Sequence, residues 1–246
     1  MKILIGIDDT DNLESRGTGF IARQLAENLK LKGLINPITV VRHQLFVSPE
    51  IPFTSHNSSA SISGELTGNI DLLKQELEAF VLQHSASGSD AGICLLQVCA
   101  DFDYSEIVRW GRNAKSRVLK KSDAHKLAES TGVFLKGLTG EKIGVIGALA
   151  AVGLRLWGND GRLLWMQHLR ETSGILKAAE IQSLIGIDCI KTTEGNIVEA
   201  DSKISIGEWT RPVLQKNLIT LYVEKVNSEV YEYQSAPKQF IKDISE

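Results

Sequence analysis

The chain has 246 residues, of which 43% are hydrophobic, so it can fill a substantial core and is expected to fold unaided. Its 27 basic and 30 acidic residues give a formal charge of −3, which excludes a global attraction to nucleic acid or to acidic membranes. The sequence shows no signal-like start and no apolar run of the ~18 residues that a membrane span needs, so we expect a cytoplasmic protein. Its three cysteines form no CxxC pair and no zinc-ligand spacing, which predicts small core residues and no structural zinc.

The first hundred residues alternate between strand and helix patterns. Unbroken apolar runs predict strands covered on both faces, whereas apolar residues that recur every four positions predict amphipathic helices. Their order, β-α-β-β-α-β, is that of a ferredoxin-like split βαβ unit, so we predict an α+β fold with this unit over residues 1–100. The strands are expected at residues 3–7, 39–47, 58–63 and 92–100, and the helices at 18–32 and after a cap at Asn69.

Residues 101–246 predict a second α/β unit packed on the first. Residues 104–130 have a helical pattern and hold the most basic stretch of the chain, which indicates either a solvated helix face or a surface for phosphate or RNA. Pro237 is expected to begin a polar tail. Strands are expected at residues 133–137, 162–169, 203–206 and 217–226, and a short helix at 176–184.

Three carboxylates, those of Asp8, Asp9 and Asp11, follow the first strand within four residues. Their mutual repulsion costs stability unless a cation or several hydrogen bonds offset it. Hard cations such as Mg²⁺ prefer carboxylate oxygens, so the cluster predicts a magnesium site. The alternative is a turn in which the aspartates make local Asx-type hydrogen bonds.

Gly17 and Gly19 bracket Thr18 where the next helix is expected to begin. Bare backbone amides and the positive end of a helix dipole would there face a phosphate, with Arg16 placed to neutralise charge on a transferred group. Magnesium ligands beside phosphate-binding amides would make a nucleotide site. Alternatively, Thr18 is an ordinary helix cap.

The stretch GVIGALAAVG predicts a helix with almost no side chains on one surface. Gly144 and Gly147 belong to that surface. Each glycine in a helix interior costs roughly 1 kcal/mol relative to alanine, so something must compensate. Tight packing against a neighbouring backbone is one explanation. The other is a ligand phosphate bound close to the start of the helix.

With IGIDDTDN, Thr18 and GVIGALAAVG, the sequence resembles the archaeal tRNA-isoleucine agmatinylcytidine synthetases over about residues 1–225. The family's IGIDDTDS motif corresponds to residues 5–12, its IGALAAIG motif to residues 146–153, and its phosphate-handling threonine to Thr18. The resemblance implies a kinase-like and a ferredoxin-like part that use ATP to activate a cytosine of tRNA. It therefore implies a kinase-like transferase or a ligase active in tRNA modification.

The sequence departs from the family between residues 46 and 60. The family pattern RLNPxIPxKTRGNGA becomes FVSPEIPFTSHNSSA, which keeps Pro49, Ile51, Pro52 and Ala60 but loses both arginines and the lysine. The family's OB-fold and cysteine-rich zinc ribbon, expected to hold tRNA, have no counterpart in this sequence. We therefore expect weak or no tRNA binding by this chain alone.

We predict a Mg²⁺-dependent and ATP-dependent enzyme that transfers phosphoryl to, or activates, a carbonyl or hydroxyl oxygen of a small-molecule or nucleobase acceptor. The alternatives are a nucleotide-binding sensor or scaffold without turnover, and a tRNA-modifying synthetase whose RNA-binding domains reside on separate chains. A homodimer is left open. The expected residues are Asp8, Asp9, Asp11 and Thr18 for catalysis, the same three aspartates for Mg²⁺, Arg16, Gly17, Gly19, Gly144 and Gly147 for the nucleotide, and His56, Asn57 and Ser58 for the acceptor.

Overall fold

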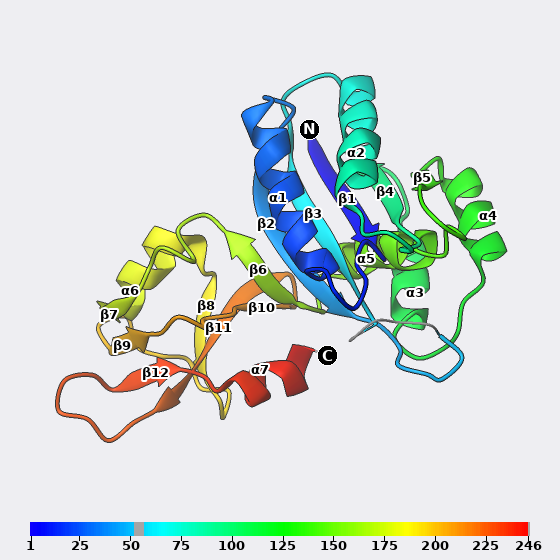
Figure 1. The fold of residues 1–246 in the computed structure, drawn as a ribbon. Helices are drawn as coiled ribbons and strands as arrows, with labels where there is room; N and C mark the ends of the chain where they lie inside the picture. The colour runs from blue at the N-terminus through cyan, green and yellow to red at the C-terminus, as the bar shows by residue number, and fades with distance from the viewer. Residues whose placement is uncertain (52–56, 246) are drawn as a thin grey trace. The chain divides into compact units, whose positions relative to one another are not determined.

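A computed structural model describes residues 1–51 and 57–245 of the chain and shows a mixed α/β fold (Figure 1). Contacts divide the chain into two compact units, Met1–Trp157 and Gly158–Glu246. Within the described residues no helix is both long and apolar enough to cross a membrane. The candidate site lies in the first unit.

The first unit is built on one antiparallel sheet with the strand order β5-β4-β1-β3-β2. Helices α1 and α2 pack against one face of this sheet, and α5 packs against the other face, chiefly on β1 and β4 (Figure 1). The strands are β1 (Lys2–Asp8), β2 (Ile35–Gln44), β3 (Ser58–Leu66), β4 (Gly92–Gln97) and β5 (Phe134–Gly137). The helices are α1 (Thr18–Leu31), α2 (Ile70–His84), α3 (Ser105–Asn113), α4 (Lys121–Thr131) and α5 (Val145–Trp157).

The glycines of α5 allow it to lie directly on the sheet. A Cβ on Gly6 of β1 would stand 1.9 Å from the carbonyl oxygen of Ala148 in α5, closer than atoms can approach. On its other side, α5 crosses α3, where a Cβ on Gly153 would stand 2.1 Å from the carbonyl oxygen of Ile107. Close packing of this kind offsets the low helix propensity of glycine. Over most of its length, therefore, the glycine-rich surface serves packing.

The unit boundary differs from the one expected after residue 100. Residues 101–157 pack on the first sheet because α5 buries its apolar surface against β1 and β4, and because β5 extends that sheet at its edge beyond β4. The expected helix over 104–130 is also divided, since residues 114–120 leave the helical path between α3 and α4. This break brings part of the basic stretch toward the candidate site.

The second unit has the strand order β6-β10-β11-β12-β9-β7, with β8 paired in parallel to β11. Residues after Pro237 form a helix rather than the expected polar tail, because Phe240, Ile241 and Ile244 pack with Tyr222 in a small apolar cluster. The strands are β6 (Arg162–Met166), β7 (Gly174–Lys177), β8 (Cys189–Thr192), β9 (Lys203–Ile206), β10 (Val213–Gln215), β11 (Leu218–Lys225) and β12 (Tyr233–Ser235). The helices are α6 (Ala178–Ile181), a π-helical turn (Gln182–Gly186) and α7 (Lys238–Ser245).

Candidate active site

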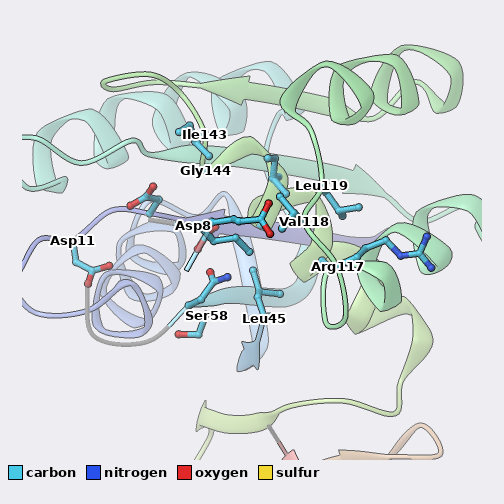
Figure 2. Close-up of a pocket in the computed structure, with 16 residues that line it drawn as sticks. Asp8, Asp11, Leu45, Ser58, Arg117, Val118, Leu119, Ile143 and Gly144 are labelled. Atoms are coloured by element: carbon cyan, nitrogen blue, oxygen red, sulfur yellow. The ribbon is translucent and has the colours of Figure 1, made fainter. Parts of the chain in front are cut away.

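A cavity of about 220 Å³ opens at the end of β1, within the first unit. It is lined by residues from the acidic loop 8–11, from 57–58 at the start of β3, from 114–119 between α3 and α4, and from 143–147 at the start of α5. Figure 2 shows Asp8 in the middle of this arrangement, with Asp11 on one side and Arg117 on the other. The fold thus brings together the acidic motif and the beginning of the glycine-rich helix, which are more than 130 residues apart in the sequence.

The carboxylate of Asp8 lies against the glycine-rich helix. A Cβ on Gly147 would stand 1.9 Å from Asp8 Oδ2, so this carboxylate occupies the space that a side chain at position 147 would fill. Burial raises the pKa of Asp8 well above its usual range, and the charges of Asp9 and Asp11 raise it further, although the backbone N–H of Asp9 donates to the carboxylate. A nearby cation would therefore stabilise the ionised form of Asp8.

Asp9 has a left-handed backbone, with φ of 55°, in the turn that follows β1. Burial raises its pKa to about 6, with further increases from the charges of Asp90 and Asp11, while the backbone N–H of Asp90 donates to the Asp9 carboxylate. Asp90 also binds the segment that precedes α5. Its carbonyl accepts from Gly144 N–H at 2.9 Å, and its carboxylate accepts from Glu141 N–H. One residue thus connects the acidic loop to the start of α5.

Thr18 is the first residue of α1 and lies beside Asp11. Its hydroxyl donates to Asp11 Oδ1 at 2.8 Å, and its backbone N–H is 3.3 Å from the same oxygen. The N–H and hydroxyl of Thr10 lie 3.3 Å and 3.1 Å from Thr18 Oγ1, which accepts from them. The proton of Thr18 is therefore directed at a carboxylate, which is the arrangement that activates a hydroxyl nucleophile. Thr18 is only 5% exposed and borders the cavity through Asp11.

The aspartates do not form a closed metal cage: in residues 1–51 and 57–245 no three His, Cys, Asp or Glu side chains gather at metal-ligating distance. Their chemistry nevertheless fits Mg²⁺, which proteins usually hold through one or two carboxylates while phosphate oxygens and waters complete the coordination. Asp8 and Asp9 line the cavity, and the pKa values of both are raised first by burial and then by neighbouring carboxylates. A bound cation would offset both effects.

The other predicted site residues are only partly brought together. Gly144 and Gly147 line the cavity with Asn57 and Ser58. Among the described residues, Gly17, the N-cap of α1, and Gly19 are not part of its lining. Arg16 is exposed, and its guanidinium lies 4.4 Å from the centre of the Phe20 ring. His56 lies outside the described residues.

Sequence reasoning missed several residues of the cavity. Arg117 belongs to the basic stretch noted in the sequence, but the break between α3 and α4 that carries it to the cavity was not predicted. Asp90 gave no sequence signal, because it is a lone aspartate before a strand. The apolar wall contributed by Leu45, Val118 and Leu119 (Figure 2) comes from three chain positions that carry no motif.

Several solved structures share the fold of this chain. The structure of a tRNA fluorescent labeling enzyme matches with a TM-score of 0.54 and 22% identity over 62% of this chain and 36% of its own. Apo TiaS, a tRNA-isoleucine agmatidine synthetase, matches with a TM-score of 0.52 and 22% identity over 62% and 35%. The complex of TiaS with its tRNA, AMPCPP and agmatine matches with a TM-score of 0.53 and 16% identity over 99% and 55%.

The chain has the fold of these proteins. It spans between about a third and just over half of their length. No protein family model and no curated protein sequence matches it. The structural neighbours agree with the resemblance found in the motifs, and at these identities the agreement concerns the fold.

Proposed function

We propose that this protein, which shares the fold of TiaS, is a Mg²⁺-dependent and ATP-dependent enzyme that transfers the γ-phosphoryl group of ATP. The observation that carries the proposal is the hydrogen bond from the Thr18 hydroxyl to Asp11, at the edge of a cavity lined by Asp8 and Asp9. Phosphoryl transfer to a protein side chain needs a nucleophile with a base beside it and a metal site for the phosphates. Here a hydroxyl is paired with one carboxylate and lies near two others that are suited to a metal. The β4-β1-β3-β2 strand order supports the prediction that the unit carrying this site is ferredoxin-like.

Asp8 and Asp9 are the residues that would hold Mg²⁺, which supplies charge neutralisation on the phosphates when it is bound. Asp11 accepts the proton of Thr18 as the threonine oxygen attacks the γ-phosphorus of ATP. The bond from that phosphorus to the bridging oxygen breaks, and ADP leaves with the electron pair. Because Thr18 is 5% exposed, the acidic loop must open for this step.

The phosphothreonine formed in this way would lie at the N-terminus of α1. Backbone amides and the helix dipole favour a phosphate there, by up to about 1 kcal/mol. Transfer onward to a carbonyl or hydroxyl oxygen would activate the acceptor, and Asn57 and Ser58, which also line the cavity, would face it. Gly144 and Gly147 line the same cavity at the start of α5, where the nucleotide would lie.

Two further functions use the same cavity. One is a tRNA-modifying synthetase that acts with separate RNA-binding chains, which the fold shared with tRNA-bound TiaS favours. The other is a sensor or scaffold that binds nucleotide without turnover, which the enclosure of Thr18 favours. We would incubate the protein with labelled ATP, with and without total tRNA and amines, and separate the products by thin-layer chromatography. ADP formation without RNA supports the kinase-like enzyme, RNA-dependent hydrolysis supports the synthetase, and no hydrolysis under any condition would contradict both.

A further inference from the structure

Ser58 presents a hydrogen-bond donor to the cavity. Its Oγ lies 3.1 Å from Nε of Arg42 in β2. A guanidinium has donors only, so the serine oxygen is the acceptor in this pair and its own proton is directed elsewhere. Among the described residues, no protein acceptor is recorded for that proton. Since Ser58 lines the cavity, the hydroxyl can donate to a bound ligand.

Arg42 is held in the orientation that this argument requires. Its Nη2 donates to Gln44 Oε1 at 2.8 Å, and Nε2 of Gln44 donates in turn to the carbonyl of Asn57 at 2.7 Å. The guanidinium is thus fixed on two sides, by Gln44 of its own strand and by Ser58 at the start of β3. As long as Arg42 donates to the Ser58 oxygen, the Ser58 proton remains available to a ligand in the cavity.

Asn57 presents the complementary group. Its Nδ2 donates to the carbonyl oxygen of Phe46 at 2.6 Å. A backbone carbonyl only accepts, so the atom that faces it must be the amide nitrogen, and this fixes which end of the side chain is Oδ1. Within the part of the chain that the structure describes, Oδ1 has no recorded donor. Because Asn57 also lines the cavity, it offers an acceptor next to the donor of Ser58.

One part of the cavity wall is apolar and suits a flat ring. Leu45 lies beside Ser58 in Figure 2, and Val118 and Leu119 lie across from them. An acceptor and a donor side by side on such a wall match a planar ring that carries an amino group next to an unprotonated ring nitrogen. Adenine and cytosine present this pattern on their Watson–Crick edge, where guanine and uracil carry a carbonyl next to a ring N–H.

We propose that Asn57 and Ser58 read the amino edge of a nucleobase, with Asn57 Oδ1 accepting from the exocyclic amine and Ser58 donating to the adjacent ring nitrogen. This assignment deepens the proposed function and rests on it for the presence of a nucleotide. Two sources can supply the edge, namely the adenine of ATP and a cytosine in the acceptor. Guanine or uracil would set donor against donor and acceptor against acceptor.

Binding measurements separate the two sources. In the first arm, calorimetry compares the Mg²⁺ complexes of ATP, CTP, GTP and UTP, which share the same phosphates and differ only in the base. In the second arm, CMP and UMP are titrated into protein saturated with a non-hydrolysable Mg²⁺–ATP analogue. An adenine site gives a preference for ATP over GTP of about ten-fold or more in the first arm. A cytosine site gives the same preference for CMP over UMP in the second arm.

Variants connect that preference to the two side chains. Ser58→Ala should lower the preference several-fold, while the matched variant Ser58→Thr, which keeps the hydroxyl, should retain it. Asn57→Ala gives an independent second test of the same edge. If neither arm discriminates, or if the preference survives both alanine variants, the assignment is overturned. Tight but indiscriminate binding of all four triphosphates, together with equal binding of CMP and UMP, would overturn it and leave phosphoryl transfer standing, whereas no nucleotide binding at all would contradict both proposals.

Discussion

The hydroxyl of Thr18 donates to Oδ1 of Asp11 over 2.8 Å, and this contact joins the acidic loop to the first turn of α1. The same carboxylate oxygen accepts from the backbone N–H of Thr18 at 3.3 Å, so Asp11 also caps the first turn of α1. Capping and activation of the hydroxyl place different demands on residue 11. A cap needs only an acceptor, whereas a base must also take up a proton.

Asp11→Asn separates these two roles. Asparagine is as good a capping residue as aspartate, so we expect the free energy of unfolding to change by less than about 0.5 kcal/mol. The amide cannot take the proton of Thr18, so phosphoryl transfer to Thr18 should fall by about two orders of magnitude or more. Urea denaturation measures the first quantity and labelling with radioactive ATP the second. Asp11→Ala is the matched control, which should lose both the cap, at a cost of about 1 kcal/mol, and the transfer.

Asp9 should make the folded state less stable as the pH rises. Its pKa is raised from 3.8 to about 6 in the folded protein, so the folded state holds this proton more tightly than the unfolded chain does. The contribution to stability is full below pH 3.8 and is lost as the pH rises through about 6. Asp9→Asn should therefore raise the free energy of unfolding at pH 7.5 by about 1–2 kcal/mol, after allowance for partial exposure. Asparagine also tolerates the left-handed backbone at this position.

Denaturation curves at pH 5 and pH 7.5 test this, with the exposed Asp101→Asn as control. The gain from Asp9→Asn should shrink toward pH 5, and the control should show no such trend. An equal gain at both pH values would contradict the assignment of the effect to ionisation.

Asp8→Asn should abolish Mg²⁺-dependent binding of ATP while leaving the protein folded. The substitution removes one of the carboxylates proposed to hold the ion. It also removes a group whose charged form is disfavoured by burial and by the charges of Asp9 and Asp11. We therefore expect the apo protein to be at least as stable as the parent. Calorimetry with Mg²⁺–ATP checks the binding, and an unchanged ATP affinity would exclude Asp8 from the metal site.

Gly6 and Gly147 lie at the same sheet–helix contact but should respond differently to alanine. A Cβ at position 147 meets the Asp8 carboxylate, which can turn aside, so Gly147→Ala should fold and lose ATP affinity. A Cβ at position 6 meets the backbone carbonyl of Ala148, which cannot move independently of α5. Gly6→Ala should therefore lower the free energy of unfolding by several kcal/mol through overpacking. Equal stability losses in the two variants would show that Gly147 serves packing alone.

Local patterns in the sequence predicted those elements whose causes are local. The four-residue apolar repeat predicted α1, and Asn69 caps α2 as expected, since its Oδ1 accepts from the N–H groups of Asp71 and Leu72. The acidic motif and the glycine-rich motif could each be found without knowledge of the fold. Their meeting in one cavity depends on the packing of α5 against β1, which no local pattern encodes.

The features that the sequence did not predict depend on tertiary contacts. The break between α3 and α4 places Arg117 at the cavity, although the helical pattern continues through it. The unit boundary falls at Trp157 because α5 covers the first sheet, whereas composition changes little at that point. Cys99, expected in the core, is exposed because β4 ends two residues earlier, at Gln97.

Mass spectrometry of the protein after incubation with Mg²⁺–ATP tests the central claim most directly. Intact mass should show the addition of one phosphoryl group, and fragment spectra should assign it to Thr18. Thr18→Ala should take up none and should lose ATP turnover, while Thr18→Ser, which keeps a hydroxyl beside Asp11, should still be modified. If the parent carries no adduct and Thr18→Ala hydrolyses ATP at the parent rate, then Thr18 only begins a helix and the proposed transfer is wrong.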